Sequence, residues 1–222
     1  MSLNLSKPIL YLITTGATAE TTTPSSEEFH AILHQVAAAV AAGIQLIQLR
    51  EKNLTTRVLF ELTERVMEIV RGTSTRVLVN DRADIAAGAG ADGVHLTLQS
   101  LEADVVRKTF GPNCLIGVST HSDVEARRAR DVGADFVVFG PVFPTRSKKE
   151  YGLPLGIGKL SAVAHDLAPF PVLAIGGVSN DNAGEYLPAG ASGVAAITLF
   201  GESETLQRNA EIIRKLFTGV VR

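Results

Sequence analysis

One short pattern recurs along the chain: a glycine, a small linker and then a run of apolar, often β-branched residues. It occurs in AAGIQLIQL, GAGADGVHL, DVGADFVVFG and PAGASGVAAI, whose glycines stand at positions 43, 90, 133 and 190. Glycine adopts the left-handed conformation that ends a helix without steric cost. The apolar run that follows is typical of a strand buried on both faces, as in parallel sheets. The pattern therefore predicts a series of helix ends, each followed by a buried strand.

Extending this pattern to the whole chain predicts eight strands. They fall at about residues 9–14, 44–49, 76–80, 93–96, 115–118, 136–140, 171–175 and 193–197. Helical patterns lie between them. In HAILHQVAAAVAA the spacing places on one face Ile32, Leu33, Val36, Ala37 and Val40. A later helix is predicted to begin after Ser122 as its N-cap and to end at Gly133.

Strict alternation of strands and helices predicts an α/β fold, a single (β/α)8 TIM barrel. The barrel would occupy residues 1–222 as one domain, with its core at about 9–217. An open doubly wound sheet is the alternative, but it usually carries a GxGxxG turn, which ITTGATAETTT lacks. The longest irregular stretch is PVFPTRSKKEYGLPLGIG, residues 141–158, and loops of this length are usually functional.

Composition limits the kinds of partner. The chain has 222 residues and a formal net charge of −2, which gives no general attraction to nucleic acid or anionic lipid. Cys114 is the only cysteine, so an intrachain disulfide is excluded, and its apolar setting in CLIGV predicts a buried structural thiol. The start of the chain lacks signal-peptide features, and no run approaches a membrane span of about 18 apolar residues. We expect a cytoplasmic protein with no membrane partner; a homo-oligomer is compatible with the sequence.

Barrel active sites form at the C-terminal ends of the strands, where this chain has several basic residues. The second strand ends in QLREK, and alternation puts Gln48, Arg50 and Lys52 on one side. Lys148 follows the sixth strand in FPTRSKK. Positive charge gathered at one mouth suits a phosphorylated substrate, because Arg and Lys bind phosphate oxygens. The competing interpretation is that these side chains only solvate loops.

A second anion site is predicted between the last two strands. AIGG ends the seventh strand and AAIT the eighth, the position at which barrels bind phosphate with loop amides and a helix N-terminus. Gly176 and Gly177 would leave the amides accessible, and Ser179 would cap the next helix. A tight turn is the alternative interpretation. Two anion sites in one mouth indicate two phosphorylated groups.

Three further polar residues near the strand ends have open roles. Asp81 follows the third strand and would either pair with a neighbouring cation or hold Mg²⁺, which prefers oxygen ligands. His121, in GVSTHS after the fifth strand, would serve either as an acid or base or as a partner for loop hydrogen bonds. His95 is expected to pack within the fourth strand.

Taken together, the motifs resemble one known family. QLREK, VNDRADIA, GADGVHL, IGVSTHS, GADFVVFGPVFPTRSKK, AIGGVS and GASGVAAIT closely resemble the thiamine phosphate synthase and thiazole tautomerase (TenI-like) family, over about residues 9–217. Members of that family share the β/α barrel. The synthase joins hydroxymethylpyrimidine diphosphate to thiazole phosphate and releases diphosphate.

The resemblance implies a role for particular residues in the synthase reaction. The pyrimidine diphosphate would be bound by Gln48, Arg50, Lys52, Asn80 and Lys148. The thiazole phosphate would be bound by Thr145, Ser147, Gly177, Ile197 and Thr198. Asp81 would hold Mg²⁺, and Ser119 would lie near the departing diphosphate. The chemistry needs charge neutralisation and close positioning of the partners rather than a protein nucleophile.

The fourth strand departs from the synthase pattern. The family carries a second magnesium carboxylate where HLTLQS has Ser100, and a neutral hydroxyl is a poorer Mg²⁺ ligand than a carboxylate. Two alternatives therefore stay open. A tautomerase would aromatise a phosphorylated thiazole carboxylate with His121 as base and without magnesium. A non-catalytic regulatory protein would only bind thiazole phosphate. The nearly complete diphosphate set favours the synthase.

Overall fold

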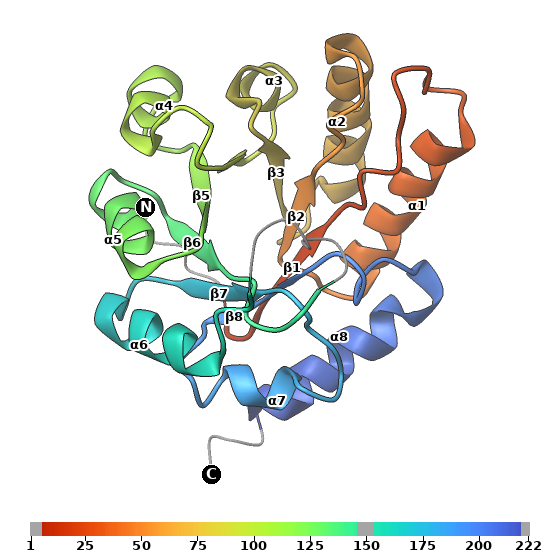
Figure 1. The fold of residues 1–222 in the computed structure, drawn as a ribbon. Helices are drawn as coiled ribbons and strands as arrows, with labels where there is room; N and C mark the ends of the chain where they lie inside the picture. Colours follow the sequence, from red (N-terminus) through yellow and green to blue (C-terminus); the bar gives the residue numbers. More distant parts are fainter. Residues whose placement is uncertain (1–5, 146–152, 219–222) are drawn as a thin grey trace.

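A computed structural model of the chain describes residues 6–145 and 153–218. Eight parallel strands pair in chain order, and β1 closes the sheet against β8. Figure 1 looks along the resulting barrel, with the helices arranged around it. The predicted (β/α)8 barrel is confirmed, and the open doubly wound sheet is excluded because the strand order never reverses.

The strands are short and each is followed by a helix. The strands are β1 Ile9–Ile13, β2 Leu46–Leu49, β3 Arg76–Asn80, β4 Gly93–Leu96, β5 Leu115–Thr120, β6 Phe136–Phe139, β7 Val172–Ile175 and β8 Gly193–Ala196. The helices are α1 Glu27–Ala41, α2 Thr56–Val70, α3 Ala83–Gly88, α4 Ala103–Phe110, α5 Asp123–Asp131, α6 Ile157–Leu167, α7 Ala183–Tyr186 and α8 Ser203–Thr218. Most predicted strand ends were right to within one residue. β5 is two residues longer than predicted, because Ser119 and Thr120 pair with β6.

The recurring glycines adopt the conformation that the sequence pattern predicts. Gly43, Gly90, Gly133 and Gly190 have φ angles of 67°, 72°, 94° and 88°, all in the left-handed region. Each follows a helix and precedes a buried strand. Because residues with a Cβ resist this conformation, the repeated glycines indicate where helices end.

Helices α1 and α5 test the predicted helical faces. In α1, Ile32 and Val36 are buried as predicted, whereas Ala37 is exposed and the prediction for it was wrong. The buried face turns instead through Gln35, whose side-chain amide donates to the carbonyls of Phe200 and Gly201 at 3.0 and 3.1 Å. A polar residue is therefore tolerated in this face because it holds the loop before α8. In α5 the hydroxyl of Ser122 accepts from the Glu125 N–H, which confirms the predicted cap.

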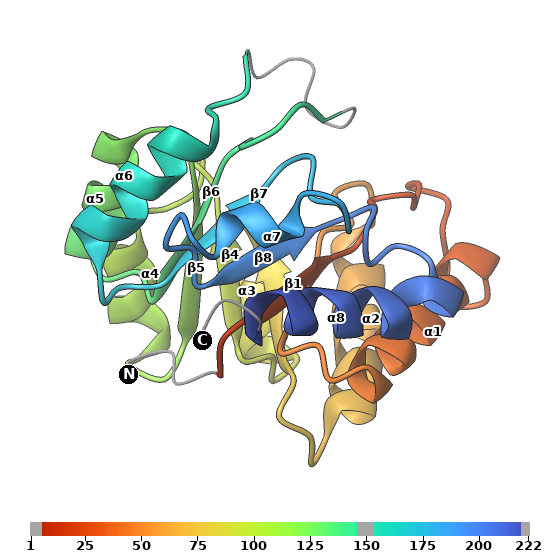
Figure 2. The same cartoon turned by 90° about the horizontal axis from the view of Figure 1, so that it is seen from below.

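The apolar core has two layers. An outer cluster packs the helices against the barrel wall, and a smaller cluster, including Tyr11, Leu46, Leu78, Phe136 and Leu173, fills the barrel interior. Figure 2 shows helices flanking the strands on both sides. The barrel interior is thus filled by side chains rather than hollow. None of the described helices combines the length and apolarity needed to cross a membrane.

Candidate active site

Four polar residues at the C-terminal half of neighbouring strands face the barrel axis. Gln48 and Asn80 each lie two residues beyond an interior residue of the same strand, Leu46 of β2 and Leu78 of β3, and His95 of β4 and Ser119 of β5 lie beside them on the same face. Successive side chains of a strand point to opposite faces, so this placement follows from the position of each residue in its strand. The structure therefore places Gln48 and Asn80, two of the residues that the sequence predicted for the pyrimidine diphosphate, on one face with His95 and Ser119.

Gln48 and Asn80 form an amide pair across β2 and β3. The Nε2 of Gln48 donates to the Oδ1 of Asn80 at 2.9 Å. Gln48 is 2% exposed, and its Oε1 is buried with no hydrogen-bond partner among the described residues. A buried acceptor without a donor is unfavourable unless a ligand supplies one. The pair thus offers an unused acceptor, and beside it the remaining amide donors of Asn80.

Arg50 and Lys52 follow β2 in a loop that is hydrogen-bonded to the residue directly after β1. Arg50 is half-buried, and its backbone N–H donates to the hydroxyl of Thr14 at 2.9 Å, while Lys52 is exposed. Gly16 lies close to this residue, because an added Cβ there would lie 3.2 Å from the Arg50 carbonyl oxygen and 3.4 Å from Arg50 Nη1. The guanidinium therefore lies against the loop that follows β1.

Glu51, between these two cations, was not assigned a role from the sequence. Its side chain is buried and its carboxylate accepts from the N–H of Gly16 at 3.2 Å and from the hydroxyl of Thr18 at 2.8 Å. The backbone N–H of Thr18 donates to it as well, at 3.4 Å. Glu51 therefore ties the β1–α1 loop to the β2–α2 loop. The signal in the sequence that could have identified Glu51 is an acidic residue between two basic ones. Its carboxylate is buried, and a buried carboxylate requires several hydrogen-bond donors.

Asp81 and Ser100 are at the two positions for which the resemblance implies magnesium ligands. Asp81 is exposed and has a φ angle of 60°, a left-handed conformation that no other described non-glycine residue adopts. The left-handed conformation of Asp81 changes the direction of the chain directly after β3. Ser100 instead closes the turn after β4: its hydroxyl accepts from the Thr97 N–H at 2.7 Å. The described residues hold no group of three or more His, Cys, Asp or Glu side chains suited to a metal ion. Asp81 alone could hold Mg²⁺ only together with oxygen ligands from a bound molecule or water.

A separate pocket lies between the ends of β7 and β8. It has a volume of about 340 Å³. The predicted thiazole phosphate residues in its wall are Thr145, Gly177, Ile197 and Thr198. The remaining predicted residues of the loop after β6, Ser147 and Lys148, lie outside the described residues. The structure thus gathers four residues from three loops around one cavity, at the place where the sequence predicts an anion site.

The two glycines after β7 have a packing role that the sequence did not predict. Gly176 and Gly177 have φ angles of 97° and 65°. A Cβ on Gly176 would lie 2.5 Å from Pro141 Cβ, and one on Gly177 would lie 2.7 Å from Phe143 Cβ. They therefore allow the loop after β6 to pack closely against the loop after β7. The predicted cap was also misplaced: Asn182, not Ser179, is the N-cap of α7, and its Oδ1 accepts from the Ser179 N–H.

A chain of hydrogen bonds crosses the barrel interior. The hydroxyl of Tyr11 lies 3.2 Å from His95 Nδ1, and His95 Nε2 lies 2.9 Å from Ser119 Oγ. Tyr11 and His95 are 0% and 2% exposed, whereas Ser119 is half-buried at the mouth. Because Tyr11 and His95 are 84 residues apart, sequence reasoning gave no sign of this contact.

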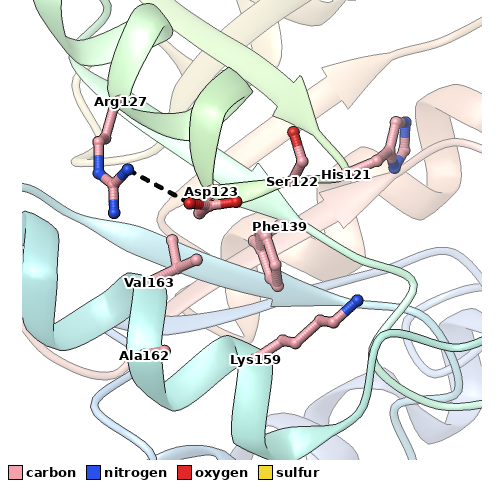
Figure 3. Close-up of a pocket in the computed structure, with 8 residues that line it drawn as sticks. All are labelled: His121, Ser122, Asp123, Arg127, Phe139, Lys159, Ala162 and Val163. Atoms are coloured by element: carbon pink, nitrogen blue, oxygen red, sulfur yellow. Dashed lines mark ion pairs between the residues drawn. The ribbon is translucent and has the colours of Figure 1, made fainter.

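His121 lies at the end of β5, beside the strand that follows. Its Nδ1 contacts the carbonyl of Gly140, and because a carbonyl oxygen only accepts, Nδ1 carries the proton in the neutral ring. His121 also borders a pocket of about 230 Å³ outside the barrel wall, between α5 and α6. Figure 3 shows this pocket, with Lys159 on one side and the Asp123–Arg127 ion pair, at 3.2 Å, on the other. This outer pocket is distinct from the cavity at β7 and β8.

Cys114 takes no part in the mouth. It is partly buried rather than fully buried as predicted, because it follows a turn at the start of β5. Burial raises the pKa of its thiol above the ordinary value, and this effect outweighs the opposing charge of Arg107. A raised pKa disfavours the thiolate, which agrees with the predicted structural role.

Known proteins have sequences and folds similar to those of this chain. A model of the thiamine monophosphate synthase family matches residues 10–200. The chain is 39% identical over 186 residues to the thiamine-phosphate synthase of Moorella thermoacetica, covering 84% of this chain and 88% of that protein. It is 40% identical over 178 residues to that of Chlorobium luteolum, covering 80% and 84%. The solved thiamine phosphate pyrophosphorylase from Pyrococcus furiosus has a TM-score of 0.79 and 32% identity, with 96% of each chain covered. The chain belongs to the thiamine monophosphate synthase family.

Proposed function

We propose that the protein is a thiamine phosphate synthase, which joins hydroxymethylpyrimidine diphosphate to thiazole phosphate and releases diphosphate. The observation that carries this proposal is the division of the mouth into two regions. The amide pair of Gln48 and Asn80, with Arg50 nearby, lies at β2 and β3. The cavity of about 340 Å³ lies at β7 and β8, on the far side of β1. Two sites in one mouth fit a reaction with two phosphorylated substrates.

The amide pair suits the pyrimidine. Gln48 Oε1 is a buried acceptor without a donor among the described residues, and an aminopyrimidine ring carries an amino donor. The same ring carries nitrogen acceptors that the amide of Asn80 can meet. Binding the ring would thus satisfy a polar atom that the protein leaves unsatisfied, and it would aim the reactive methylene toward the centre of the mouth.

The first chemical step would be departure of the diphosphate. The bond between the methylene carbon and the diphosphate oxygen breaks, both electrons leave with the oxygen, and a stabilised pyrimidine methyl cation results. Arg50, Lys52 and Lys148 would neutralise the leaving charge, with Ser119 as a hydrogen-bond donor. Asp81 would hold Mg²⁺, which when bound neutralises charge on the diphosphate. Its single carboxylate fits an ion held largely by substrate oxygens.

The second step would join the partners. The ring nitrogen of the thiazole donates its lone pair to the methyl cation, and the new carbon–nitrogen bond forms without any proton transfer. Backbone amides near Gly177, Ile197 and Thr198, together with Thr145, would hold the thiazole phosphate. The protein's contribution is to keep the nitrogen close to the cation and to keep water away from it. Neither step requires a nucleophile or a base from the protein, which agrees with the roles proposed for the residues of the mouth.

Product formation tests the proposal directly. The protein is mixed with the pyrimidine diphosphate, thiazole phosphate and Mg²⁺, and thiamine phosphate and released diphosphate are measured. We expect both products in equal amounts. Conversion of the thiazole carboxylate phosphate isomer without thiamine phosphate would instead establish the tautomerase, for which the His121 ring is oriented with Nε2 as its basic nitrogen. Binding of thiazole phosphate with no turnover at all would establish a regulatory protein. A cytoplasmic location and a homo-oligomer stay predictions from the sequence.

A further inference from the structure

The hydrogen-bonded chain of Tyr11, His95 and Ser119 contains two buried polar side chains that the reaction steps above do not use. Tyr11 reaches His95 from β1 across the interior, and His95 on β4 meets Ser119 on the adjacent strand β5. Ser119 is the partly exposed end of the chain, next to where the diphosphate is proposed to leave. Which atom donates in each of these hydrogen bonds determines whether Ser119 presents its proton or its lone pairs to the mouth.

The buried phenol sets the direction of these hydrogen bonds. Burial raises the pKa of Tyr11 well above its ordinary value, so the hydroxyl keeps its proton. Among the described residues, its hydrogen-bond partner is His95 Nδ1. If the phenol donates to Nδ1, the neutral ring carries its own proton on Nε2 and donates to Ser119 Oγ. The opposite direction would leave the phenol proton buried without an acceptor, which is unfavourable.

Packing holds the imidazole ring in this orientation. The ring lies against Tyr11 and Phe136, with ring centroids 5.8 and 6.3 Å away. On the remaining side the chain has Gly117, where an added Cβ would lie 2.9 Å from His95 Nδ1 and 2.4 Å from Phe136 Cζ. A side chain at position 117 would therefore collide with both rings, so the glycine is needed for the imidazole to occupy this place.

We propose that His95 is a positioning residue, which donates to the hydroxyl of Ser119 so that the Ser119 proton is directed into the mouth, toward the departing diphosphate. This inference rests on the proposed synthase function. With His95 donating, Ser119 is an acceptor toward the ring and a donor toward the substrate. Without it, the hydroxyl rotates freely and offers its lone pairs as often as its proton to an anion. The arrangement therefore supplies a directed donor at the place where negative charge develops.

Two replacements of His95 distinguish the roles of its two ring nitrogens. His95→Asn keeps a polar atom near Nδ1 for Tyr11 and removes the donor to Ser119, whereas His95→Gln places an amide N–H near the position of Nε2. We expect His95→Asn to lower kcat by about tenfold to a hundredfold, with the KM for the pyrimidine diphosphate changed by less than about threefold. His95→Gln should recover much of that loss. His165→Asn, the same replacement at an exposed position of α6, serves as control.

A double variant shows whether His95 acts through Ser119. Ser119→Ala should lower kcat to a similar extent, and adding His95→Asn to it should lower kcat no further. Additive losses, or no gain from His95→Gln over His95→Asn, would overturn the positioning role. Unchanged binding of thiazole phosphate to each variant verifies the fold. If the wild-type protein forms no thiamine phosphate, both this role and the proposed function are wrong; if it forms the product and the losses add, only the positioning role is wrong.

Discussion

At the scale of single residues, the mouth contains polar atoms whose hydrogen bonds are incomplete within the described part of the chain. Gln48 Oε1 is buried without a partner, and Asp81 holds a left-handed conformation at the tip of β3. Both features are unfavourable in a protein with no ligand, and such features concentrate at functional sites. Gln48 and Asn80 were predictable, because alternation along a strand fixes which residues face the axis.

Replacing Asn80 tests the amide pair. Asn80→Ala removes the acceptor of the Gln48 Nε2 hydrogen bond and the amide donors that we assign to the pyrimidine. We expect the KM for the pyrimidine diphosphate to rise by about tenfold or more, since a polar recognition contact is lost, while the KM for thiazole phosphate stays within about twofold. Steady-state kinetics with each substrate varied in turn measures this. Asn113→Ala, at an exposed position before β5, is the control. Equal increases in both KM values would contradict the assignment.

Ser100 tests the metal proposal. In Ser100→Asp one carboxylate oxygen can still accept from the Thr97 N–H, so the turn is preserved while a second oxygen becomes available as a ligand. We expect the Mg²⁺ concentration for half-maximal activity to fall by about threefold or more. Gln99→Asp adds the same charge at an exposed neighbouring position and should leave this concentration unchanged. An identical magnesium dependence in Ser100→Asp and the wild type would argue against a metal near this turn.

At the scale of elements, the loops that carry the site are fastened to one another. Glu51 joins the loops after β1 and β2, and Asn53 reinforces this contact through its side-chain donation to the Thr18 carbonyl at 2.9 Å. Gly176 and Gly177 let the loops after β6 and β7 pack together. Neither contact was predictable from the sequence, because the partners come from different units of the repeat and meet only when the barrel closes.

Glu51→Gln should loosen the first of these contacts. The amide keeps the shape of the carboxylate, but its NH₂ group replaces an acceptor that faces N–H and O–H donors. We expect a loss of about 2 kcal/mol in the free energy of unfolding. For a chain of this size that corresponds to a decrease in Tm of about 4–8 °C. Thermal denaturation measures it, with Glu64→Gln on the exposed face of α2 as control. A Tm equal to that of the control would show that the carboxylate contributes nothing.

Gly177→Ala tests the second contact. Alanine at φ 65° is strained, and its Cβ would also meet Phe143 and the Pro144 carbonyl at 2.7 Å. Gly72→Ala, at φ 77° with nothing within 4 Å, carries the strain of about 1 kcal/mol without the collision. We expect Gly177→Ala to raise the KM for thiazole phosphate by about tenfold and Gly72→Ala to leave it unchanged. Matching kinetics for the two variants would mean that loop packing does not shape this cavity.

At the scale of the whole molecule, barrel closure unites parts of the chain that the sequence shows separately. The eight strands and the family could be predicted, because left-handed glycines and buried apolar runs are local signals. Closure also places β1 beside β8 and brings Tyr11 to His95, and no local signal reports such a contact. The sequence therefore predicts site residues that lie at the end of a single strand. It does not predict contacts between residues of two different strands.

The central claim is that one mouth holds two separate anion sites. Calorimetric titration of the protein with thiazole phosphate, first alone and then with saturating diphosphate and Mg²⁺, tests it without turnover. We predict one thiazole phosphate bound per chain in both titrations, with dissociation constants that agree within about threefold. A dissociation constant that rises in proportion to the diphosphate concentration would mean that the two anions compete for a single site, and it would contradict the account.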